Sequence, residues 1–367
     1  MKTEAVVLRT HGGPEVLTQE TIDLPDPGAR EVLVRVRAVA LNHLDLWVRR
    51  GLPNLRLEYP HRLGADVVGE IEALGPGARS ASNARVGDRV VVSPGVSCGV
   101  CDRCLSGDDT LCASFGILGE HRSGGYARHL IVPDANLAAY PGDLPFTQVA
   151  AVPLVFLTAW QMLVVKARVK AGETVLVHAA GSGVSSAAIQ IARLHGARVI
   201  ATASTEAKAQ RARALGADDV IVAGPEGPDF VGEVKRLTGK RGADVVVEHI
   251  GGEVLSRSVI ATASGGRIVT CGATAGYLPT IDMRHVFFRQ ISILGSTMGS
   301  KGTLSGILDH VQAGKLVPVV DAEDHHPDIR IFSYRWLALD YSTHAIGALT
   351  ENDFIMAAKV NELLPPP

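Results

Sequence analysis

The chain has 367 residues, of which 46% are hydrophobic and 20% are charged. That length exceeds what one hydrophobic core usually supports and fits two domains, and the composition is that of a folded protein. Lys and Arg number 36 against 38 Asp and Glu, a formal net charge of −2, which argues against a nucleic-acid partner. Without an apolar run of ~18–20 residues or a secretory signal, we expect a cytoplasmic protein with no membrane partner.

The first 150 residues contain short apolar runs broken by Gly and Pro. Residues 31–37 and 88–92 are two such runs, each bounded by turn residues, and both patterns are typical of β-strands. We therefore expect this part of the chain to form an irregular, barrel-like β domain.

Four of the five cysteines lie close together within this part, at Cys98, Cys101, Cys104 and Cys112. Two-residue gaps let successive thiolates converge on one point, and tetrahedral Zn²⁺ takes four such ligands. The alternatives are a disulfide pair, which a reducing compartment disfavours, and thiols without metal. Because four thiolates leave no open position for water or substrate, the spacing predicts one structural Zn²⁺ rather than a catalytic site.

From about residue 174 strands alternate with helices. The predicted strands are residues 175–177, 199–201, 220–222, 245–247, 267–271 and 291–294, and the predicted helices cover residues 187–192 and 207–215. Six apolar strands with crossover helices indicate a doubly wound parallel sheet in an α/β protein. Cys271, on one of these strands, is interpreted as a small core residue.

The first of these strands runs into a turn of small residues ahead of a helix. Such a turn lets the backbone approach a pyrophosphate at the helix N-terminus, although Ser186 stands where a third glycine is usual and an ordinary strand–helix turn is the alternative. The alternating elements that follow favour dinucleotide binding. The predicted contacts are Ala180, Gly181, Ser182, Gly183 and Val184.

The end of the second strand bears on which dinucleotide is bound. NAD is favoured by an acid that accepts the ribose 2′-hydroxyl, but here the strand ends in Ser204 and Thr205, with Lys208 and Arg211 on the next helix. Hydroxyls and cations suit a 2′-phosphate, so NADPH is predicted over NADH. The nearest acid, Glu206, is expected in the first helical turn, where the helix dipole stabilises it.

These features together resemble the medium-chain dehydrogenase/reductase superfamily, which includes zinc alcohol dehydrogenases and quinone oxidoreductases. The resemblance covers roughly residues 1–320 and is carried by the cysteine cluster and by three motifs, Gly64-Ala65-Asp66-Val67-Val68-Gly69, Val86-Gly87-Asp88-Arg89-Val90 and Ala150-Ala151-Val152-Pro153 leading to Thr158.

The resemblance implies a GroES-like β-barrel catalytic domain over residues 1–152, with a zinc lobe at about 95–115. It further implies a Rossmann NADP-binding domain over 153–295 and a return to the catalytic domain over 296–367, atypical after about 321. A homodimer or homotetramer is usual in this superfamily. By analogy, Gly272, Gly295 and Ser296 contact the nicotinamide half of the cofactor.

The chain departs from the zinc alcohol dehydrogenases at the positions that hold their second, catalytic zinc. Those three positions carry Asn42, Ala65 and Leu154, which together cannot ligate Zn²⁺. The proton-relay positions carry Leu44 and Trp47. The chain is therefore more similar to the zinc-independent branch, in which hydride passes from NADPH to a quinone or an α,β-unsaturated carbonyl and conjugation delocalises the charge.

Within this branch the segment Leu41-Asn42-His43-Leu44-Asp45 matches the quinone reductase pattern. We expect Asn42 to donate a hydrogen bond to the developing enolate and Thr158 to lie beside the nicotinamide. His43 is a candidate proton donor or a surface residue, and Asp45 is a candidate catalytic acid that equally fits a role in fixing the backbone.

Other residues have two interpretations each. Asp66 matches an acid that, in the zinc enzymes, lies next to the zinc ligands without binding the metal, and we interpret it as retained here for structure. Arg49 is a weaker candidate for holding substrate or cofactor. His121 is interpreted as non-ligating because four thiolates saturate zinc. Three aromatic residues either line an apolar substrate pocket or simply pack in the core: Trp47, Phe156 and Trp160.

The resemblance stops after Asp321. The following Asp324-His325-His326-Pro327 and the end of the chain reproduce no expected strand. Two alternative functions therefore stay open. One is an alcohol dehydrogenase with an unconventional second metal site at His43, Asp45 or Asp66, and the other is a non-catalytic NADPH-binding protein.

Overall fold

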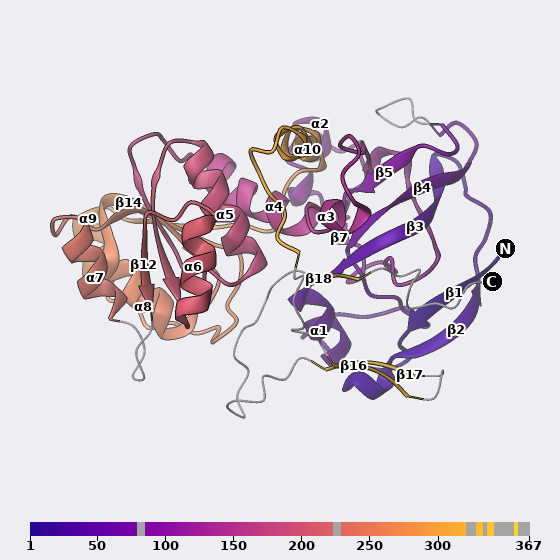
Figure 1. Cartoon of the computed structure of the whole chain (residues 1–367), viewed down its shortest axis with the longest axis horizontal. Helices are drawn as coiled ribbons and strands as arrows, with labels where there is room; N and C mark the ends of the chain where they lie inside the picture. Colours follow the sequence, from indigo (N-terminus) through magenta and orange to yellow (C-terminus); the bar gives the residue numbers. More distant parts are fainter. Residues whose placement is uncertain (79–84, 223–228, 321–327, 333–335, 341–355, 359–367) are drawn as a thin grey trace. The chain divides into compact units, whose positions relative to one another are not determined.

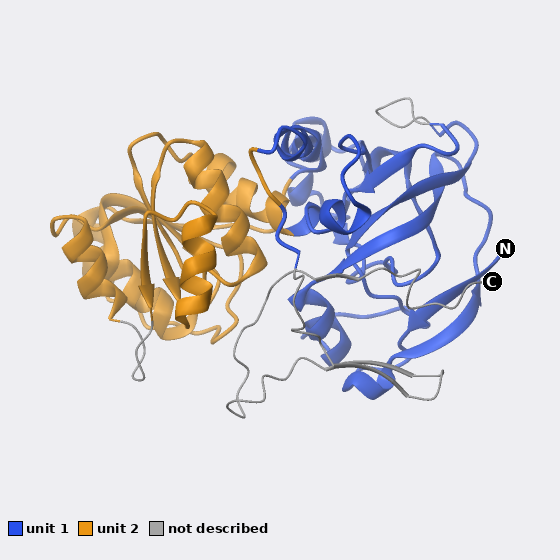
Figure 2. Ribbon diagram, viewed as in Figure 1, with its two compact units in different colours: residues 1–154, 300–314, 318–367 blue, residues 155–299, 315–317 orange. Residues whose placement is uncertain are grey.

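The computed structural model describes the whole chain except residues 79–84, 223–228, 321–327, 333–335, 341–355 and 359–367 (Figure 1). The chain divides into two compact units (Figure 2). Unit 1 comprises Met1–Leu154, Ser300–Gly314 and Pro318–Pro367, and unit 2 comprises Val155–Gly299 and Lys315–Val317.

Unit 1 is built mainly of antiparallel strands. These are β1 (Lys2–Val7), β2 (Thr18–Asp23), β3 (Glu31–Leu41), β4 (Asp66–Leu74), β5 (Arg89–Val92), β6 (Gly95–Val96), β7 (Gly116–Ile117), β8 (His129–Pro133), β9 (Leu137–Ala139), β16 (Asp328–Phe332), β17 (Trp336–Asp340) and β18 (Met356–Ala358). The helical segments are η1 (Pro14–Val16), α1 (His43–Arg50), α2 (Asp102–Leu105), η2 (Asp109–Leu111), η3 (Asp134–Asn136), α3 (Phe146–Ala150), η5 (Lys301–Thr303) and α10 (Leu304–Gln312).

The main sheet of unit 1 is organised around β3. Its order is β18-β3-β4-β5-β9, and β8 also pairs with β3. The pairing of β3 with β4 is irregular in two places, as is usual where a strand bends into a barrel. Val32, Val34 and Val36 are fully buried because alternate side chains of β3 point into the core. β3 ends at Leu41, and the chain turns into α1 at Asn42.

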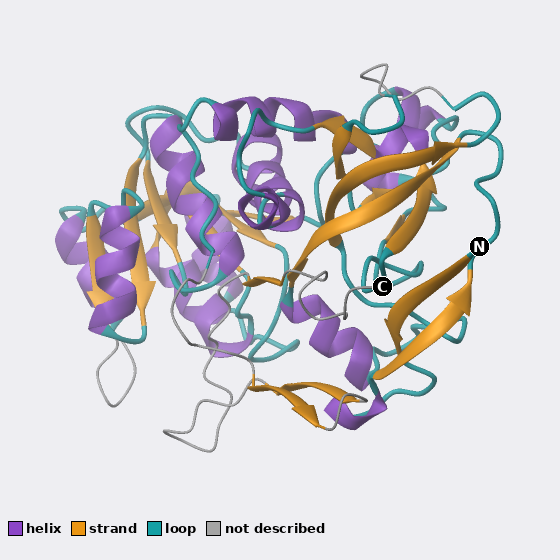
Figure 3. Ribbon diagram, turned by 45° about the vertical axis from the view of Figure 1, so that its right-hand side comes forward, coloured by secondary structure: helices purple, strands orange, loops and turns teal. Residues whose placement is uncertain are grey.

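Unit 2 contains a parallel sheet of six strands. They are β10 (Thr174–Val177), β11 (Arg198–Ala203), β12 (Asp219–Val222), β13 (Ala243–Glu248), β14 (Thr262–Thr270) and β15 (Ser292–Gly295), in the order β12-β11-β10-β13-β14-β15. The helical segments are α4 (Pro153–Trp160), η4 (Gln161–Lys166), α5 (Gly183–Leu194), α6 (Glu206–Ala214), α7 (Phe230–Leu237), α8 (Gly252–Ala261) and α9 (Met283–Arg289), and Figure 3 shows helices flanking the sheet.

Along the chain, successive strands are added on one side of β10 up to β12 and on its other side from β13 onwards. The boundary between β10 and β13 is the topological switch point of a doubly wound sheet, where ligands bind at the carboxyl ends of the strands. The α/β fold class and the six predicted strands are thus confirmed. One detail was wrong: β14 ends at Thr270, so Cys271 lies just beyond the strand and is only partly buried. None of the helices in the described residues combines the length and hydrophobicity needed to cross a bilayer.

Candidate functional sites

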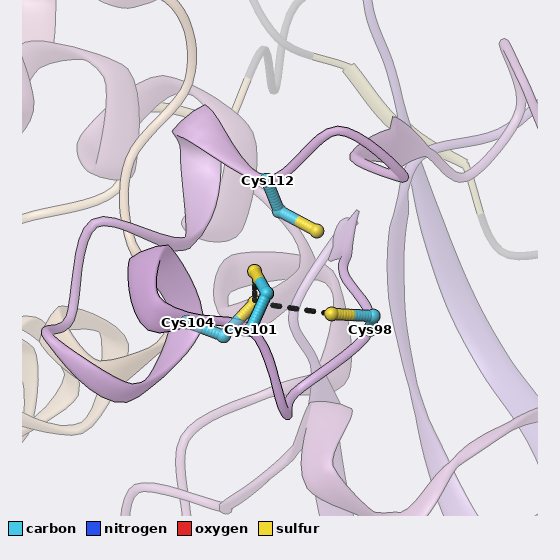
Figure 4. A group of neighbouring side chains, drawn as sticks. All are labelled: Cys98, Cys101, Cys104 and Cys112. Carbon is cyan, nitrogen blue, oxygen red and sulfur yellow. Dashed lines mark hydrogen bonds between the residues drawn. The ribbon is translucent and has the colours of Figure 1, made fainter.

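The four clustered cysteines of unit 1 converge on a single point (Figure 4). Cys98 follows β6, Cys101 and Cys104 lie at the start and within α2, and Cys112 follows η2. Their sulfur atoms all lie within 4.8 Å of one another. Two short helical segments therefore bring together thiols that are up to 14 positions apart in the sequence.

The spacing of the sulfurs fits a tetrahedral metal and not a disulfide. The Sγ–Sγ distance is 3.8 Å between Cys98 and Cys104 and 3.6 Å between Cys101 and Cys104. A zinc ion with Zn–S bonds of about 2.3 Å separates its sulfurs by about 3.8 Å, whereas a disulfide needs about 2.05 Å. Backbone N–H groups of Val100 and Cys101 also lower the pKa of Cys98 to about 6, which favours the thiolate.

The environment of the cluster agrees with a structural site. Lys301 Nζ donates to Ser97 Oγ at 2.9 Å, which ties the start of the lobe to a segment some 200 residues later. His121, the nearby histidine, accepts from Ile117 N through Nδ1 and is not part of the cluster. Among the described residues, the four cysteines form the only group of three or more His, Cys, Asp or Glu side chains placed to hold a metal.

A second polar site in unit 1 is centred on Asp66, at the start of β4. Its carboxylate accepts from Asn42 Nδ2 at 2.9 Å through Oδ2 and from the backbone N of Leu154 at 2.7 Å through Oδ1. Two of the three positions that correspond to catalytic-zinc ligands therefore contact this one carboxylate, and Ala65 directly precedes it. Asp66 is fully buried, and burial raises its pKa to about 7.

Asp45 connects this site to the neighbouring backbone. Its carboxylate accepts from Asn42 N at 2.8 Å and from Gly64 N at 2.9 Å, so it joins the start of α1 to the turn before β4. Burial raises its pKa to about 6, against the lowering effect of these two N–H groups. This geometry agrees with the interpretation in which Asp45 fixes the backbone around Asn42.

The remaining candidates have less specific surroundings. His43, the first residue of α1, packs edge-on against Trp47 at 5.0 Å between ring centroids. Arg49 and Phe156 are buried, and Trp160 packs against His195. Thr158 belongs to unit 2, where it is buried and its hydroxyl lies 4.0 Å from the sulfur of Met298.

In unit 2 the predicted phosphate turn joins β10 to α5. Ala179 N and Ala180 N donate to the side-chain and backbone oxygens of Thr202, which fixes the turn to β11. Ser182 is the N-cap of α5, and its Oγ accepts from Ser185 N. Helix α5 begins at Gly183, so Gly183 and Val184 of the predicted contacts lie in its first turn, at the positive end of the helix dipole.

The end of β11 presents hydroxyls and a cation. Lys208 Nζ donates to Ser204 Oγ at 3.2 Å, and Thr205 is the N-cap of α6. The stem of Lys208 crosses the phosphate turn so closely that a Cβ at Gly181 would lie 3.0 Å from Lys208 Cδ. Glu206 lies in the first turn of α6, as expected, and forms an ion pair with Arg213.

The third set of predicted cofactor contacts lies at the ends of β14 and β15. Ser296 N donates to Thr270 O, and Thr270 Oγ1 donates to Gly272 O. Ser296 Oγ is buried and has no hydrogen-bond partner among the residues that the structure describes. A buried hydroxyl needs a partner, so this atom fits a polar ligand beside Gly295.

Comparisons with known proteins agree with this architecture. Residues 28–142 match the family described as alcohol dehydrogenase GroES-like domain, and residues 183–313 match that described as zinc-binding dehydrogenase. Residues 313–363 match a different family, pterin 4 alpha carbinolamine dehydratase. Of the stretch after Asp321 that departs from the dehydrogenase pattern, residues 322–363 lie inside this third match. The motif Asp324-His325-His326-Pro327 lies outside the described residues.

Individual proteins are similar over most of the chain. The quinone oxidoreductase of Homo sapiens is 32% identical over 297 residues, 81% of this chain and 80% of that protein. The NAD-dependent alcohol dehydrogenase of Sulfurisphaera tokodaii is 32% identical over 317 residues, 83% of this chain and 88% of that protein. A crystal structure of an NAD-dependent alcohol dehydrogenase has 55% identity and a TM-score of 0.82, covering 86% of this chain and 91% of that one.

The two-unit fold, the phosphate turn and these relatives define an NAD(P)-dependent oxidoreductase. The chain belongs to the medium-chain dehydrogenase/reductase superfamily.

Two features of these sites were not predicted from the sequence. The first is the contact between Asn42 and Asp66, which joins the start of a helix to a strand 24 positions away. The second is His249, which follows β13 and reaches the phosphate turn. Its place after a predicted strand, at the carboxyl edge of a parallel sheet, was the one available signal.

Proposed function

We propose that this chain is an NADPH-dependent oxidoreductase that transfers hydride to a quinone or an α,β-unsaturated carbonyl without a catalytic metal. One observation carries the proposal. At the positions where zinc alcohol dehydrogenases hold their catalytic zinc, this chain has Asn42, Ala65 and Leu154. The side-chain amide of Asn42 and the backbone N–H of Leu154 both donate to the buried carboxylate of Asp66. Hydrogen-bond donors thus lie where metal ligands would be needed.

Asn42 is the residue that we assign to stabilising charge on the substrate. An amide nitrogen carries two hydrogens, and Asp66 accepts one of them. The second is available to a substrate oxygen on which negative charge develops. Asp45 holds the backbone of Asn42 in place, which keeps this donor oriented during the reaction. His43 remains a candidate for delivering the proton to the substrate carbon.

The cofactor preference rests on the end of β11. When bound, the nicotinamide supplies the hydride, and the chain's own residues bind and orient it. Lys208 and Ser204 lie together where a ribose 2′-phosphate would be recognised, while Glu206 is paired with Arg213. Ser296 Oγ and the backbone at Gly272 and Gly295 are assigned to the nicotinamide half.

Zinc has a structural role in this proposal. Cys98, Cys101, Cys104 and Cys112 would hold one Zn²⁺ with all four positions filled by protein, so no position remains for substrate. The chain should therefore contain one zinc whose removal unfolds the lobe and which takes no part in hydride transfer.

An alcohol dehydrogenase is the second candidate function, because the relative with 55% identity is called an NAD-dependent alcohol dehydrogenase. This candidate requires oxidation of simple alcohols and a preference for NAD. Under it, chelator-sensitive turnover should be seen while the structural zinc is still bound.

One experiment separates the two candidates. Zinc content is measured on the purified protein, NADPH and NADH oxidation is followed with quinones, enones and simple aldehydes, and NADP⁺ and NAD⁺ reduction is followed with ethanol. We expect about one zinc per chain, turnover of enones or quinones with NADPH, and none of ethanol. Two zincs per chain, or alcohol turnover at a comparable rate, would refute the proposal.

We further propose a homodimer or homotetramer. β15 is the last strand of the described sheet, and large apolar side chains are exposed on and around it and α9. They are Tyr277, Leu278, Met283, Phe287, Phe288 and Ile293. A second copy of the chain would cover both the unpaired strand edge and this apolar surface. Light scattering should give at least twice the chain mass, and Phe288→Asp should lower it.

A further inference from the structure

A buried group of polar side chains lies behind the phosphate turn of unit 2. His249, just after β13, places Nε2 3.2 Å from Ser182 Oγ and 3.0 Å from Ser185 Oγ. The exposed fractions of His249 and Ser182 are 8% and 7%, and Ser185 is fully buried. Ser182 is both the N-cap of α5 and a predicted cofactor contact, so His249 touches the phosphate turn from the inside of the protein.

The directions of these hydrogen bonds follow from counting hydrogens. Ser185 Oγ donates to His178 O at 2.6 Å, and Ser182 Oγ donates to Ser185 Oγ at 3.0 Å. A hydroxyl has one hydrogen, and in this arrangement both hydrogens are in use, so both oxygens are left to accept from the imidazole. We therefore assign a hydrogen to His249 Nε2, which lies within reach of both hydroxyl oxygens.

We propose that His249 is a positioning residue that makes Ser182 a hydrogen-bond donor to the cofactor diphosphate. While Ser182 Oγ accepts the Nε2–H of His249, the hydroxyl hydrogen of Ser182 can rotate away from Ser185 and point to a phosphate oxygen. Ser185 Oγ still has an N–H donor after this rotation, because His249 Nε2 lies within 3.2 Å of both oxygens. No buried group loses its partner, so the rearrangement has a low cost. The inference rests on nicotinamide dinucleotide binding at this turn.

His178 provides a built-in comparison. It lies in the same buried region, but its ring contacts Thr202 Oγ1 and Ser258 Oγ instead of the hydroxyls of the turn. Burial lowers its pKa to about 3, so it stays neutral. Ser258→Ala therefore disturbs a neighbouring buried histidine without changing the hydrogen bonds of Ser182, and serves as the matched control.

The test measures cofactor affinity in the full chain with its zinc bound. His249→Phe keeps a ring and removes the donor, and we expect the Kd for NADPH, measured by fluorescence titration, to rise about three- to tenfold. His249→Gln keeps an N–H donor and should show a smaller rise. Ser258→Ala should change the melting temperature but leave the Kd within about twofold.

A double-mutant cycle shows whether His249 acts through Ser182. Ser182→Ala alone should weaken NADPH binding, and adding His249→Phe should weaken it no further. Adenosine 2′-phosphate, which lacks the diphosphate, should bind wild type and His249→Phe equally. If the phenylalanine ring prevents folding, His249→Leu makes the same test.

The outcomes that overturn the inference differ from those that overturn the proposed function. His249→Phe binding NADPH within about twofold of the wild type, or effects that multiply in the double variant, would refute the role of His249. A wild-type protein that binds neither NADPH nor NADH would instead refute the proposed function.

Discussion

The cysteine cluster and the Asp66 site belong to the same unit, and both correspond to metal sites of zinc alcohol dehydrogenases, but their chemistry differs. At the cluster all four thiols are present and their sulfurs lie within 4.8 Å. Around Asp66, an amide, a methyl group and a leucine occupy the three ligand positions, and N–H groups bind the carboxylate. The two regions differ in what they offer a metal: the cysteine cluster has four converging thiols, whereas the Asp66 site has hydrogen-bond donors around one buried carboxylate.

The largest expected effect is loss of the structural metal. Cys104→Ser removes one of the four ligands and should abolish zinc binding. Because metal binding is coupled to folding of the lobe, the free energy of unfolding should fall by more than about 4 kcal/mol. Zinc analysis and urea denaturation check this result. Cys271→Ser is the matched control, since Cys271 is not part of the cluster, and it should keep full zinc content.

A cysteine variant that kept both its zinc and its stability would show that the cluster is not a closed tetrahedral site. It would also remove the contrast between the two regions, because the metal would then be bound elsewhere.

The second largest effect is expected at Asn42. Asn42→Ala removes the amide that we assign to the substrate oxygen, and kcat should fall by about 100-fold, as on removal of one donor to a developing oxyanion. The backbone N–H of Asn42 remains to bind Asp45. Leu154 acts on Asp66 through its backbone N–H, so Leu154→Ala should lower kcat less than tenfold.

Steady-state kinetics with an enone or a quinone check both variants. An unchanged kcat in Asn42→Ala would mean that the Asp66 site has no part in the reaction, and the assignment of the donor would be wrong.

The third effect concerns the other unit. Lys208→Met keeps the stem that crosses Gly181 and removes the ammonium group, so the Kd for NADPH should rise about 10- to 100-fold while that for NADH changes little. Arg213→Met, which breaks only the ion pair with Glu206, is the control. Equal effects of Lys208→Met on both cofactors would contradict a contact with the 2′-phosphate.

The sequence was most informative where local pattern and local structure coincide. The strands of unit 2, the turn after β10 and the four cysteines are all set by contiguous runs or short spacings, and each was predicted from the residues alone. The pairing of Asn42 with Asp66 and of His249 with Ser182 joins residues 24 and 67 positions apart. Neither hydrophobic periodicity nor a short residue spacing indicates such long-range contacts, so they become visible only in the folded chain.

The end of the chain was unpredictable for another reason. The dehydrogenase match ends at residue 313, and the match to the pterin 4 alpha carbinolamine dehydratase family begins there. The dehydrogenase pattern does not extend over residues 322–363, which lie within the match to that other family.

The smallest expected effect is the pH dependence of stability that Asp66 introduces. Burial raises its pKa to about 7 in the folded protein, above the ~3.9 of an unfolded chain. The folded state therefore keeps the proton over this interval while the unfolded state releases it. The free energy of unfolding should fall as pH rises from about 4 to about 7, by at most about 1.4 kcal/mol per pH unit.

Asp45 acts in the same direction, but its pKa of about 6 limits its contribution to the lower part of that interval. The difference between wild type and Asp66→Asn isolates Asp66 between about pH 6 and 7, where the slope should flatten in the variant. Urea denaturation at closely spaced pH values measures both curves. Parallel curves in this range would mean that Asp66 is already ionised in the folded state. The N–H groups of Asn42 and Leu154 would then outweigh its burial, and a fixed negative charge would lie behind Asn42.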